Sequence, residues 1–347
     1  MEQRLGTGIN GLVNEMLAGD SVSLARLITF VERESSEVPD IIKAIHLHTG
    51  KAHRIGITGP PGAGKSTLVG KLAEAILGDG KSVGIICVDP SSPFSGGALL
   101  GDRIRMQQLY LNNEIFIRSM ATRGGHGGLP KTVGNVVKLL DAFGKNFIII
   151  ETVGVGQTEL NILENADTII VTLVPEAGDM IQAMKAGIME IGDIFVVNKA
   201  DRPGAEEMVT SLESALMLSA KISSWQTPVI LTEALNNVGI SELYQTILKH
   251  RKIAIESGIF DQRRQKQRKG EFLQLMEERL LDEIIRSFET DSDFAEYLSL
   301  VENGRIEPYT ATEEIINKDV IRQVLKAPVR NKHGKLSKTD AQASPQP

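Results

Sequence analysis

The sequence has a single cysteine, Cys87, and so cannot form a disulfide within the chain; this favours a reducing compartment. It also lacks an apolar run of the roughly 18 residues that a membrane-spanning helix needs. The longest runs, such as residues 147–150, have the length of a strand. The amino-terminal residues show no basic segment followed by an apolar one, and they include Glu2 and Glu15. We therefore expect neither export nor organelle import, but a soluble protein of the cytoplasm that binds no membrane.

An excess of basic residues is absent as well. The 347 residues include 38 Lys and Arg against 44 Asp and Glu, a formal net charge of −6. This charge gives no general electrostatic reason to bind nucleic acid. With 41% hydrophobic and 24% charged residues, the composition is that of a folded globular protein. No internal repeat is visible.

Strand-like and helix-like segments alternate in residues 51–250, which predicts an α/β domain. Strands are expected at 54–58, 82–88, 115–118, 147–151, 168–174, 194–198 and 228–232. Helices are expected near 65–78, 132–143, 178–190, 205–220 and 239–251. Because several strands are apolar at consecutive positions, they should be buried on both faces of a doubly wound, mostly parallel sheet.

A helical extension is expected before this domain, over residues 1–50. Its apolar residues Leu24, Leu27, Ile28 and Val31 share one helix face, with a cap near residues 20–21. A second, shorter helix should run from Ile41 to His48 and stop at Gly50.

A helical arm is expected over residues 251–328, with a disordered tail over 329–347. Residues 251–270 carry seven Lys or Arg against two acids and should be solvated. Further helices are predicted over 268–289 and near 311–326. The first of these carries an apolar stripe: Phe272, Leu275, Met276, Leu280, Ile284 and Phe288. Either this chain's own domain or a second copy must cover the stripe.

The clearest motif is a phosphate-binding loop between a predicted strand and a predicted helix. It reads Gly59-Pro60-Pro61-Gly62-Ala63-Gly64-Lys65-Ser66-Thr67 and fits the pattern G-x-x-x-x-G-K-S/T. Its backbone N–H groups should converge on phosphate oxygens at the helix N-terminus. We expect Lys65 to be an exposed ligand of the β- and γ-phosphates, and the Ser66 hydroxyl to bind Mg²⁺. A chance glycine-rich turn is the alternative, and the flanking strand and helix disfavour it.

Glu151 ends a predicted strand, at the place where an acid organises Mg²⁺ in P-loop proteins. The N–H group of Gly154, three residues later, can reach a γ-phosphate. Many P-loop proteins carry Asp at this position, and the longer Glu suits a water-mediated metal contact. A surface glutamate that merely ends a strand is the alternative.

Asn198, Lys199 and Asp201 fit the guanine-binding pattern N-K-x-D. The Asp201 carboxylate can accept hydrogen bonds from the ring N–H and the amino group of guanine, which adenine cannot offer. The stem of Lys199 would lie over the purine. The motif follows a later strand, at the edge where parallel sheets bind ligands. Backbone N–H groups of the loop after the next strand should also contact the base: Thr232, Glu233, Ala234 and Leu235.

These motifs and their order resemble the methylmalonyl-CoA mutase-associated GTPases of the MeaB/ArgK type, over about residues 10–330. The resemblance also rests on residues 88–92, 100–106 and 123–128, and on the diagnostic run E-T-V-G-V-G-Q over 151–157. It implies that Asp89 and Asp102 are switch acids near Mg²⁺ and the γ-phosphate.

The resemblance further implies that residues 176–179, with Lys185, form a switch that contacts the mutase. Glu176 stands where the family usually has Gly, and Glu233 where it usually has Ser. Both departures bear on the identity of the partner more than on GTP binding.

The sequence thus predicts a GTPase that uses GTP and Mg²⁺. Its motifs assign catalysis to Lys65 and Glu151 and metal binding to Ser66 and Glu151. The resemblance adds Asp102 to the catalytic residues and Asp89 and Asp102 to the metal ligands, some of which would act through water. No Gln or Arg can be assigned to positioning the attacking water, so we expect slow hydrolysis that a partner accelerates.

The resemblance implies a chaperone that loads and protects an adenosylcobalamin-dependent acyl-CoA mutase. It also implies an adenosyltransferase as a further partner and a homodimer formed through the carboxyl-terminal helices. No cobalamin site is evident in this chain. Alternatives are a metallochaperone GTPase for a nickel enzyme, a P-loop small-molecule kinase and a purely structural module. Six scattered histidines, the guanine motif and the phosphate loop disfavour these three in turn.

Overall fold

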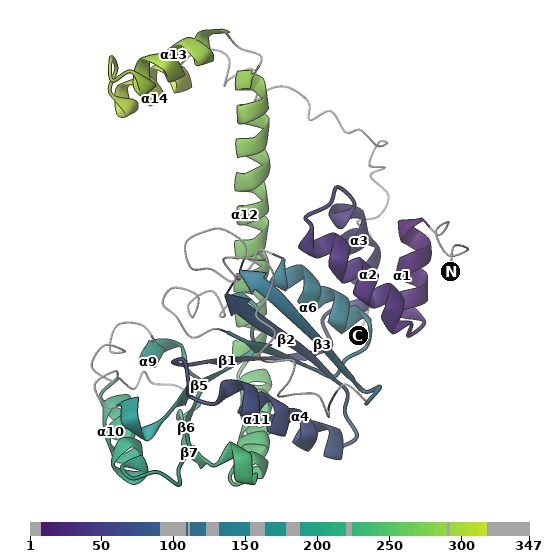
Figure 1. Cartoon of the computed structure of the whole chain (residues 1–347), viewed down its shortest axis with the longest axis vertical. Helices are drawn as coiled ribbons and strands as arrows, with labels where there is room; N and C mark the ends of the chain where they lie inside the picture. The colour runs from purple at the N-terminus through teal and green to yellow at the C-terminus, as the bar shows by residue number, and fades with distance from the viewer. Residues whose placement is uncertain are drawn as a thin grey trace. The chain divides into compact units, whose positions relative to one another are not determined.

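The computed structural model (Figure 1) describes residues 8–90, 109, 112–122, 132–152, 164–177, 188–219, 224–289 and 292–317. Contacts divide the chain into two compact units, Met1–Arg268 and Lys269–Pro347. Within the described ranges, the helices are all too short or too polar to cross a membrane.

The described strands form one seven-stranded sheet in the first unit. They are β1 (His53–Thr58), β2 (Val83–Pro90), β3 (Ile115–Thr122), β4 (Phe147–Glu151), β5 (Thr168–Leu173), β6 (Ile194–Asn198) and β7 (Val229–Thr232). Every adjacent pair is parallel, in the order β3-β2-β4-β1-β5-β6-β7. Because the chain adds strands on both sides of β1, the prediction of a doubly wound parallel sheet is confirmed.

Helices cover both faces of this sheet (Figure 1). One apolar core holds residues of α2 (Ser21–Glu32), α6 (Val133–Ala142) and α10 (Ala205–Ser219). The other holds residues of α4 (Lys65–Gly78) and α11 (Ile240–Glu256). The consecutive isoleucines of β4 divide between the cores, with Ile148 and Ile150 in the first and Ile149 in the second. This two-sided burial explains the uninterrupted apolar pattern of the strand.

The amino-terminal helices pack into the first of these cores. They are α1 (Ile9–Leu17), α2 and α3 (Val38–Ile45). The 3₁₀ turn η1 (His46–His48) follows α3 and has no buried residue. The predicted cap of α2 is confirmed, because Asp20 Oδ2 accepts the N–H of Ser23 at 3.0 Å. The helix predicted from Ile41 to His48 instead begins at Val38, where Pro39 lies in the first turn.

Three short elements complete the described α/β region: η4 (Pro175–Ala177), α9 (Ile188–Ile191) and η5 (Ala234–Asn236). Of the helix predicted over 178–190, only the α9 end lies within the described residues.

The carboxyl-terminal helices are α12 (Ile259–Glu289), α13 (Ser292–Glu302) and α14 (Pro308–Asn317). The helix predicted over 268–289 therefore begins at Ile259. The expectation of a solvated basic stretch is wrong for Arg263 and Arg264, which bind the carboxylates of Asp193 and Asp167. In the second unit, the hydroxyl of Tyr297 on α13 donates to Glu314 of α14 at 2.7 Å. The predicted tail lies outside the described residues.

Candidate functional site

The phosphate loop connects the carboxyl end of β1 to the first turn of α4. Gly59 has φ +138°, and a Cβ atom there would lie 1.9 Å from the carbonyl oxygen of Thr172 on β5. Gly64 has φ +83°, and its Cβ atom would lie 2.4 Å from Nδ2 of Asn198. Both positions require glycine, because a side chain would meet both backbone strain and a steric clash.

Lys65 lies inside this loop. Its Nζ donates to the carbonyl oxygens of Gly59 at 2.8 Å and Pro60 at 3.0 Å. The residue is only 7% exposed, so the expectation that it is exposed is wrong. The loop carbonyls hold the ammonium group beside the N-terminus of α4, where the sequence predicts that backbone N–H groups bind phosphate.

Ser66 and Glu151 meet at the edge of the sheet. The Ser66 hydroxyl donates to Glu151 Oε1 at 2.7 Å, and Glu151 is 5% exposed. The alternative of a surface glutamate at a strand end is therefore wrong. A hydroxyl and a carboxylate are hard oxygen ligands of the kind that Mg²⁺ prefers, so the pair fits that ion.

Sequence reasoning missed a contact between Cys87 and Glu151. Cys87 lies opposite Glu151 in the parallel register of β2 and β4, with Sγ 3.9 Å from Oε2. The register could have been found only by knowing that β2 and β4 are neighbours. Such a thiol is a weak hydrogen-bond donor to the carboxylate.

Asn198 joins the phosphate loop to the predicted base-binding loops. Its Nδ2 donates to the carbonyl oxygen of Ala63 at 2.8 Å. Its Oδ1 accepts from the hydroxyl of Thr232 at 3.0 Å and from the N–H of Ala234 at 3.1 Å. A second link runs from Lys199 Nζ to the carbonyl oxygen of Gly62 at 2.7 Å. The three loops therefore form one connected structure.

The side chain of Asp201 is exposed beside these loops. In the loop after β7, the N–H of Glu233 binds the carbonyl oxygen of Val238 at 3.1 Å, and that of Ala234 binds Asn198. Leu235 is 84% exposed. In this structure, the loop's backbone holds Asn198, and its contact with a base stays a prediction.

A cavity of about 310 Å³ lies over the phosphate loop. The lining residues are Gly62, Gly64, Lys65, Ser66, Thr67, Glu151 and Lys199. The structure thus brings the predicted phosphate, metal and base residues to one edge of the sheet. Asp102, Gly154 and the side chain of Asp89 lie outside the described residues.

An ion pair next to this edge was also missed by sequence reasoning. Arg202, directly after the base motif, binds the carboxylate of Glu176 in η4. The hydrogen bond from Arg202 lowers the pKa of Glu176 below its ordinary value. The pair links the loop after β5 to the loop after β6, although both side chains are exposed.

Comparisons with known proteins match one family model and several relatives. A family model described as "Methylmalonyl Co-A mutase-associated GTPase MeaB" matches residues 24–289. A protein of Pyrococcus horikoshii that carries a GTPase name is 44% identical over 319 residues, which cover 90% of this chain and 99% of that one.

Two further matches extend over most of the chain. The mouse "Methylmalonic aciduria type A homolog, mitochondrial" is 31% identical over 337 residues, 91% of this chain and 80% of that one. The crystal structure of a protein titled "LAO/AO transport system kinase" superimposes with a TM-score of 0.66 at 26% identity, over 92% of this chain and 98% of that one.

Proposed function

The chain belongs to the MeaB family of methylmalonyl-CoA mutase-associated GTPases. We propose that it couples GTP hydrolysis to chaperoning an adenosylcobalamin-dependent mutase. In this proposal it loads the cofactor into an acyl-CoA mutase of the cytoplasm and protects that mutase, and an adenosyltransferase is a further partner. The family description and the name of the mouse relative support the link to a mutase.

The observation that carries the nucleotide part is the bridge made by Asn198. One side chain binds Ala63 in the phosphate loop and Thr232 and Ala234 beyond the base motif. A nucleotide bound by both loops would span this bridge, with its phosphates at Lys65 and its guanine at Asp201. The connected loops fix the distance between the two contacts before the ligand arrives, which reduces the entropy lost on binding.

In hydrolysis, the chain's own residues position the phosphates and stabilise developing negative charge. The N–H groups of the phosphate loop and the N-terminal dipole of α4 point at the phosphates, and Lys65 adds a positive charge. Ser66 and Glu151, with Asp89 and Asp102, would hold Mg²⁺, which neutralises charge on the phosphate oxygens. Water is the attacking nucleophile.

We also propose a two-fold homodimer formed through the apolar stripe of α12. Phe272 is 61% exposed, and Leu275, Met276 and Leu280 are exposed as well. An apolar surface of this kind favours association, and a two-fold axis would place the same stripe of both copies in one interface. Light scattering that gives a monomer at tens of micromolar would contradict the dimer.

The mutase proposal is tested by mixing the full chain with candidate enzymes specific for methylmalonyl-, isobutyryl- or hydroxyisobutyryl-CoA. We expect one of them to co-elute with the chain on gel filtration and to raise its GTP hydrolysis rate at least about tenfold. A mutase whose cobalamin domain is absent serves as the matched control. If none of the three binds with GDP, with GTP or without nucleotide, the mutase proposal is wrong.

A further inference from the structure

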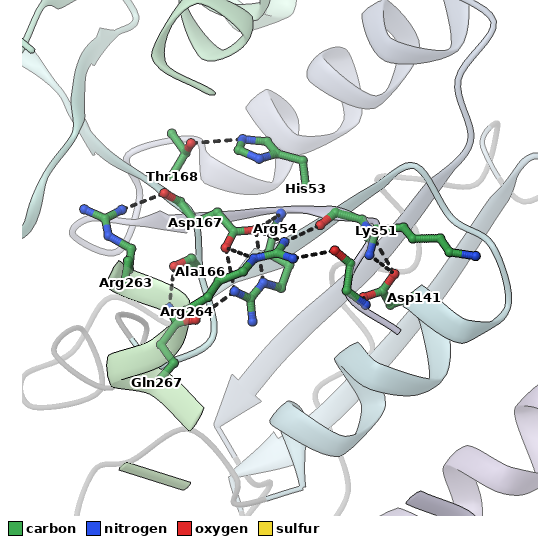
Figure 2. A network of polar contacts seen from close by, with 12 residues as sticks. Lys51, His53, Arg54, Asp141, Ala166, Asp167, Thr168, Arg263, Arg264 and Gln267 are labelled. Carbon is green, nitrogen blue, oxygen red and sulfur yellow. Dashed lines mark hydrogen bonds and ion pairs between the residues drawn. The ribbon is translucent and has the colours of Figure 1, made fainter. Parts of the chain in front are cut away.

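A second polar cluster lies at the sheet edge opposite the nucleotide loops, where β1, β5 and β6 begin. Figure 2 shows the part of it around Asp167 and Arg264. We call it the amino-end cluster. It joins the first turns of α12 to the sheet through six residues: Arg54, Asp167, Asp193, Arg263, Arg264 and Gln267. No sequence motif marks it, and the nucleotide site does not use it.

Arg264 is the centre of this cluster. Its Nε and Nη2 donate to the two carboxylate oxygens of Asp167 at 3.0 and 2.7 Å. Its Nη1 and Nη2 also donate to the carbonyl oxygens of Gly50 at 2.6 Å and Ala52 at 2.7 Å. The guanidinium lies 4.3 Å from the ring centre of Phe260. Four hydrogen bonds and a ring contact fix the plane of the guanidinium. A lysine ammonium could not reproduce this set of contacts.

Asp167 is fully buried and also binds Arg54. Burial alone would raise the pKa of Asp167, but the hydrogen bonds from Arg264 and Arg54 hold it well below its ordinary range. The carboxylate therefore stays charged, and removal of Arg264 would leave it without its strongest partner.

These contacts fix β1 at the end where it begins. The N–H groups of Gly50, Lys51 and Ala52 bind the Asp141 carboxylate at 2.6, 3.1 and 2.9 Å. Arg264 binds two carbonyl oxygens of the same three residues, and Figure 2 shows it between Asp167 and this segment.

At its other end, β1 runs directly into the phosphate loop. Gly59 lies so close to Thr172 of β5 that there is no room for a Cβ atom. The amino end of β5 follows Asp167. A shift of β1 along β5 would therefore move the phosphate loop against Thr172, because packed strands transmit displacement rather than absorb it.

Arg263 forms a second anchor, for β6, and its Nη1 also donates to the carbonyl oxygen of Asp167 at 2.6 Å. Its guanidinium donates to both carboxylate oxygens of Asp193 at 2.7 and 2.9 Å. Burial would raise the pKa of Asp193, but Arg263 and His250 lower it to about 2. Asp193 directly precedes β6, and that strand ends at Asn198, the first residue of the base motif.

We propose that Arg264 and Arg263 are positioning residues for nucleotide binding that act from the far edge of the sheet. Arg264, through Asp167 and β1, sets the phosphate loop. Arg263, through Asp193 and β6, sets the base loop. The first turns of α12 thus belong to the nucleotide-binding machinery. The inference rests on the nucleotide site proposed above.

The test compares Arg264→Lys and Arg263→Lys in the full chain. The affinities for GDP, GTP and inosine triphosphate, which lacks the 2-amino group of guanine, are measured by calorimetry. We expect Arg264→Lys to weaken all three about fivefold, with the GTP-to-inosine triphosphate ratio unchanged. We expect Arg263→Lys to reduce that ratio about threefold, with a smaller effect on overall affinity.

Arg268→Lys is the matched control, since Arg268 is an exposed arginine on the same helix. It should leave all three affinities unchanged. If Arg264→Lys does not fold, Gln267→Ala tests the same anchor more mildly, because Gln267 binds Arg54 and the carbonyl oxygen of Ala166. It should weaken all three affinities about twofold.

If the two arginines have only a structural role, the variants should melt at lower temperatures but bind the nucleotides normally below the melting transition. That result would overturn the proposal. So would two variants with the same affinity profile. Wild-type protein that binds neither GDP nor GTP would instead overturn the nucleotide site itself. The two failures are therefore distinguishable.

Discussion

The Ser66 hydroxyl donates to the Glu151 carboxylate at 2.7 Å across 85 residues of sequence. Ser66 lies in the first turn of α4 and Glu151 ends β4, so the contact exists only because β4 lies beside β1. The pair gives two oxygen ligands at the phosphate loop.

Glu151→Gln should raise the Mg²⁺ concentration needed for half-maximal GTP hydrolysis by about tenfold. The amide still accepts the Ser66 hydrogen bond, but it lacks the charge that attracts a divalent ion. A magnesium titration of the hydrolysis rate measures this. Glu164→Gln, at an exposed position, is the control. An unchanged magnesium requirement would remove Glu151 from the metal site.

Lys65→Ala should slow GTP hydrolysis on the order of 10³-fold, because a charge that stabilises the transition state is lost. Circular dichroism should show the fold unchanged. Lys71→Ala on the same helix, where the ammonium contacts Glu74, should hydrolyse GTP normally. Near-normal turnover by Lys65→Ala would refute the catalytic assignment.

Asp201→Asn should shift the preference from GTP toward xanthosine triphosphate. The amide places a donor where guanine also has one, whereas the C2 carbonyl of xanthine accepts it. Competition binding with GTP, xanthosine triphosphate and ATP measures the change, and Asp261→Asn is the control. If wild-type protein binds ATP as tightly as GTP, the guanine assignment is wrong.

Truncation after Arg268 should leave a folded, monomeric protein that binds GDP. Truncation after Glu256, at the end of α11, removes Arg263 and Arg264 and leaves Asp167 with Arg54 and Asp193 with His250. Loss of one partner of a buried pair costs about 3–5 kcal/mol, so the shorter protein should melt far lower or fail to fold. Equal melting temperatures for the two would contradict this account of the cluster.

Acid should destabilise the first unit through His53. Burial is the main reason that the pKa of His53 is lowered to about 3. The charge of Asp167 opposes this shift, whereas the charges of Arg251 and His250 add to it. Between pH 6.5 and about 3 the unfolded chain binds a proton that the folded chain does not. The stabilisation is complete above pH 6.5 and falls by ~1.4 kcal/mol per pH unit below it.

Urea denaturation between pH 7 and pH 4 measures this slope. His53→Gln keeps a polar atom for Thr168, which His53 Nε2 contacts at 3.0 Å, but it does not titrate and should flatten the slope. His48→Gln, at an exposed site, should not. A wild-type slope equal to that of His53→Gln would contradict the burial argument.

The sequence by itself determined the parts that depend on neighbouring residues. The phosphate loop and the base motif are contiguous, so their glycines, Lys65 and Asp201 could be read directly. The seven strands were also predicted, and β4, β5 and β6 were the clearest because a strand buried on both faces is apolar along its own length. The order of the motifs was enough to predict the sheet edge where they meet.

Only the tertiary structure decided the contacts that depend on strand order. Arg264 looked like one of seven basic residues in a solvated stretch, yet its carboxylate partner, Asp167, lies 97 residues earlier. Cys87 meets Glu151 because β2 pairs with β4, and Lys65 is buried because the loop folds around it. The physical reason is that burial and ion pairing depend on which segments pack together in space. That packing is fixed by the free energy of the whole fold, and no local pattern in the chain records it.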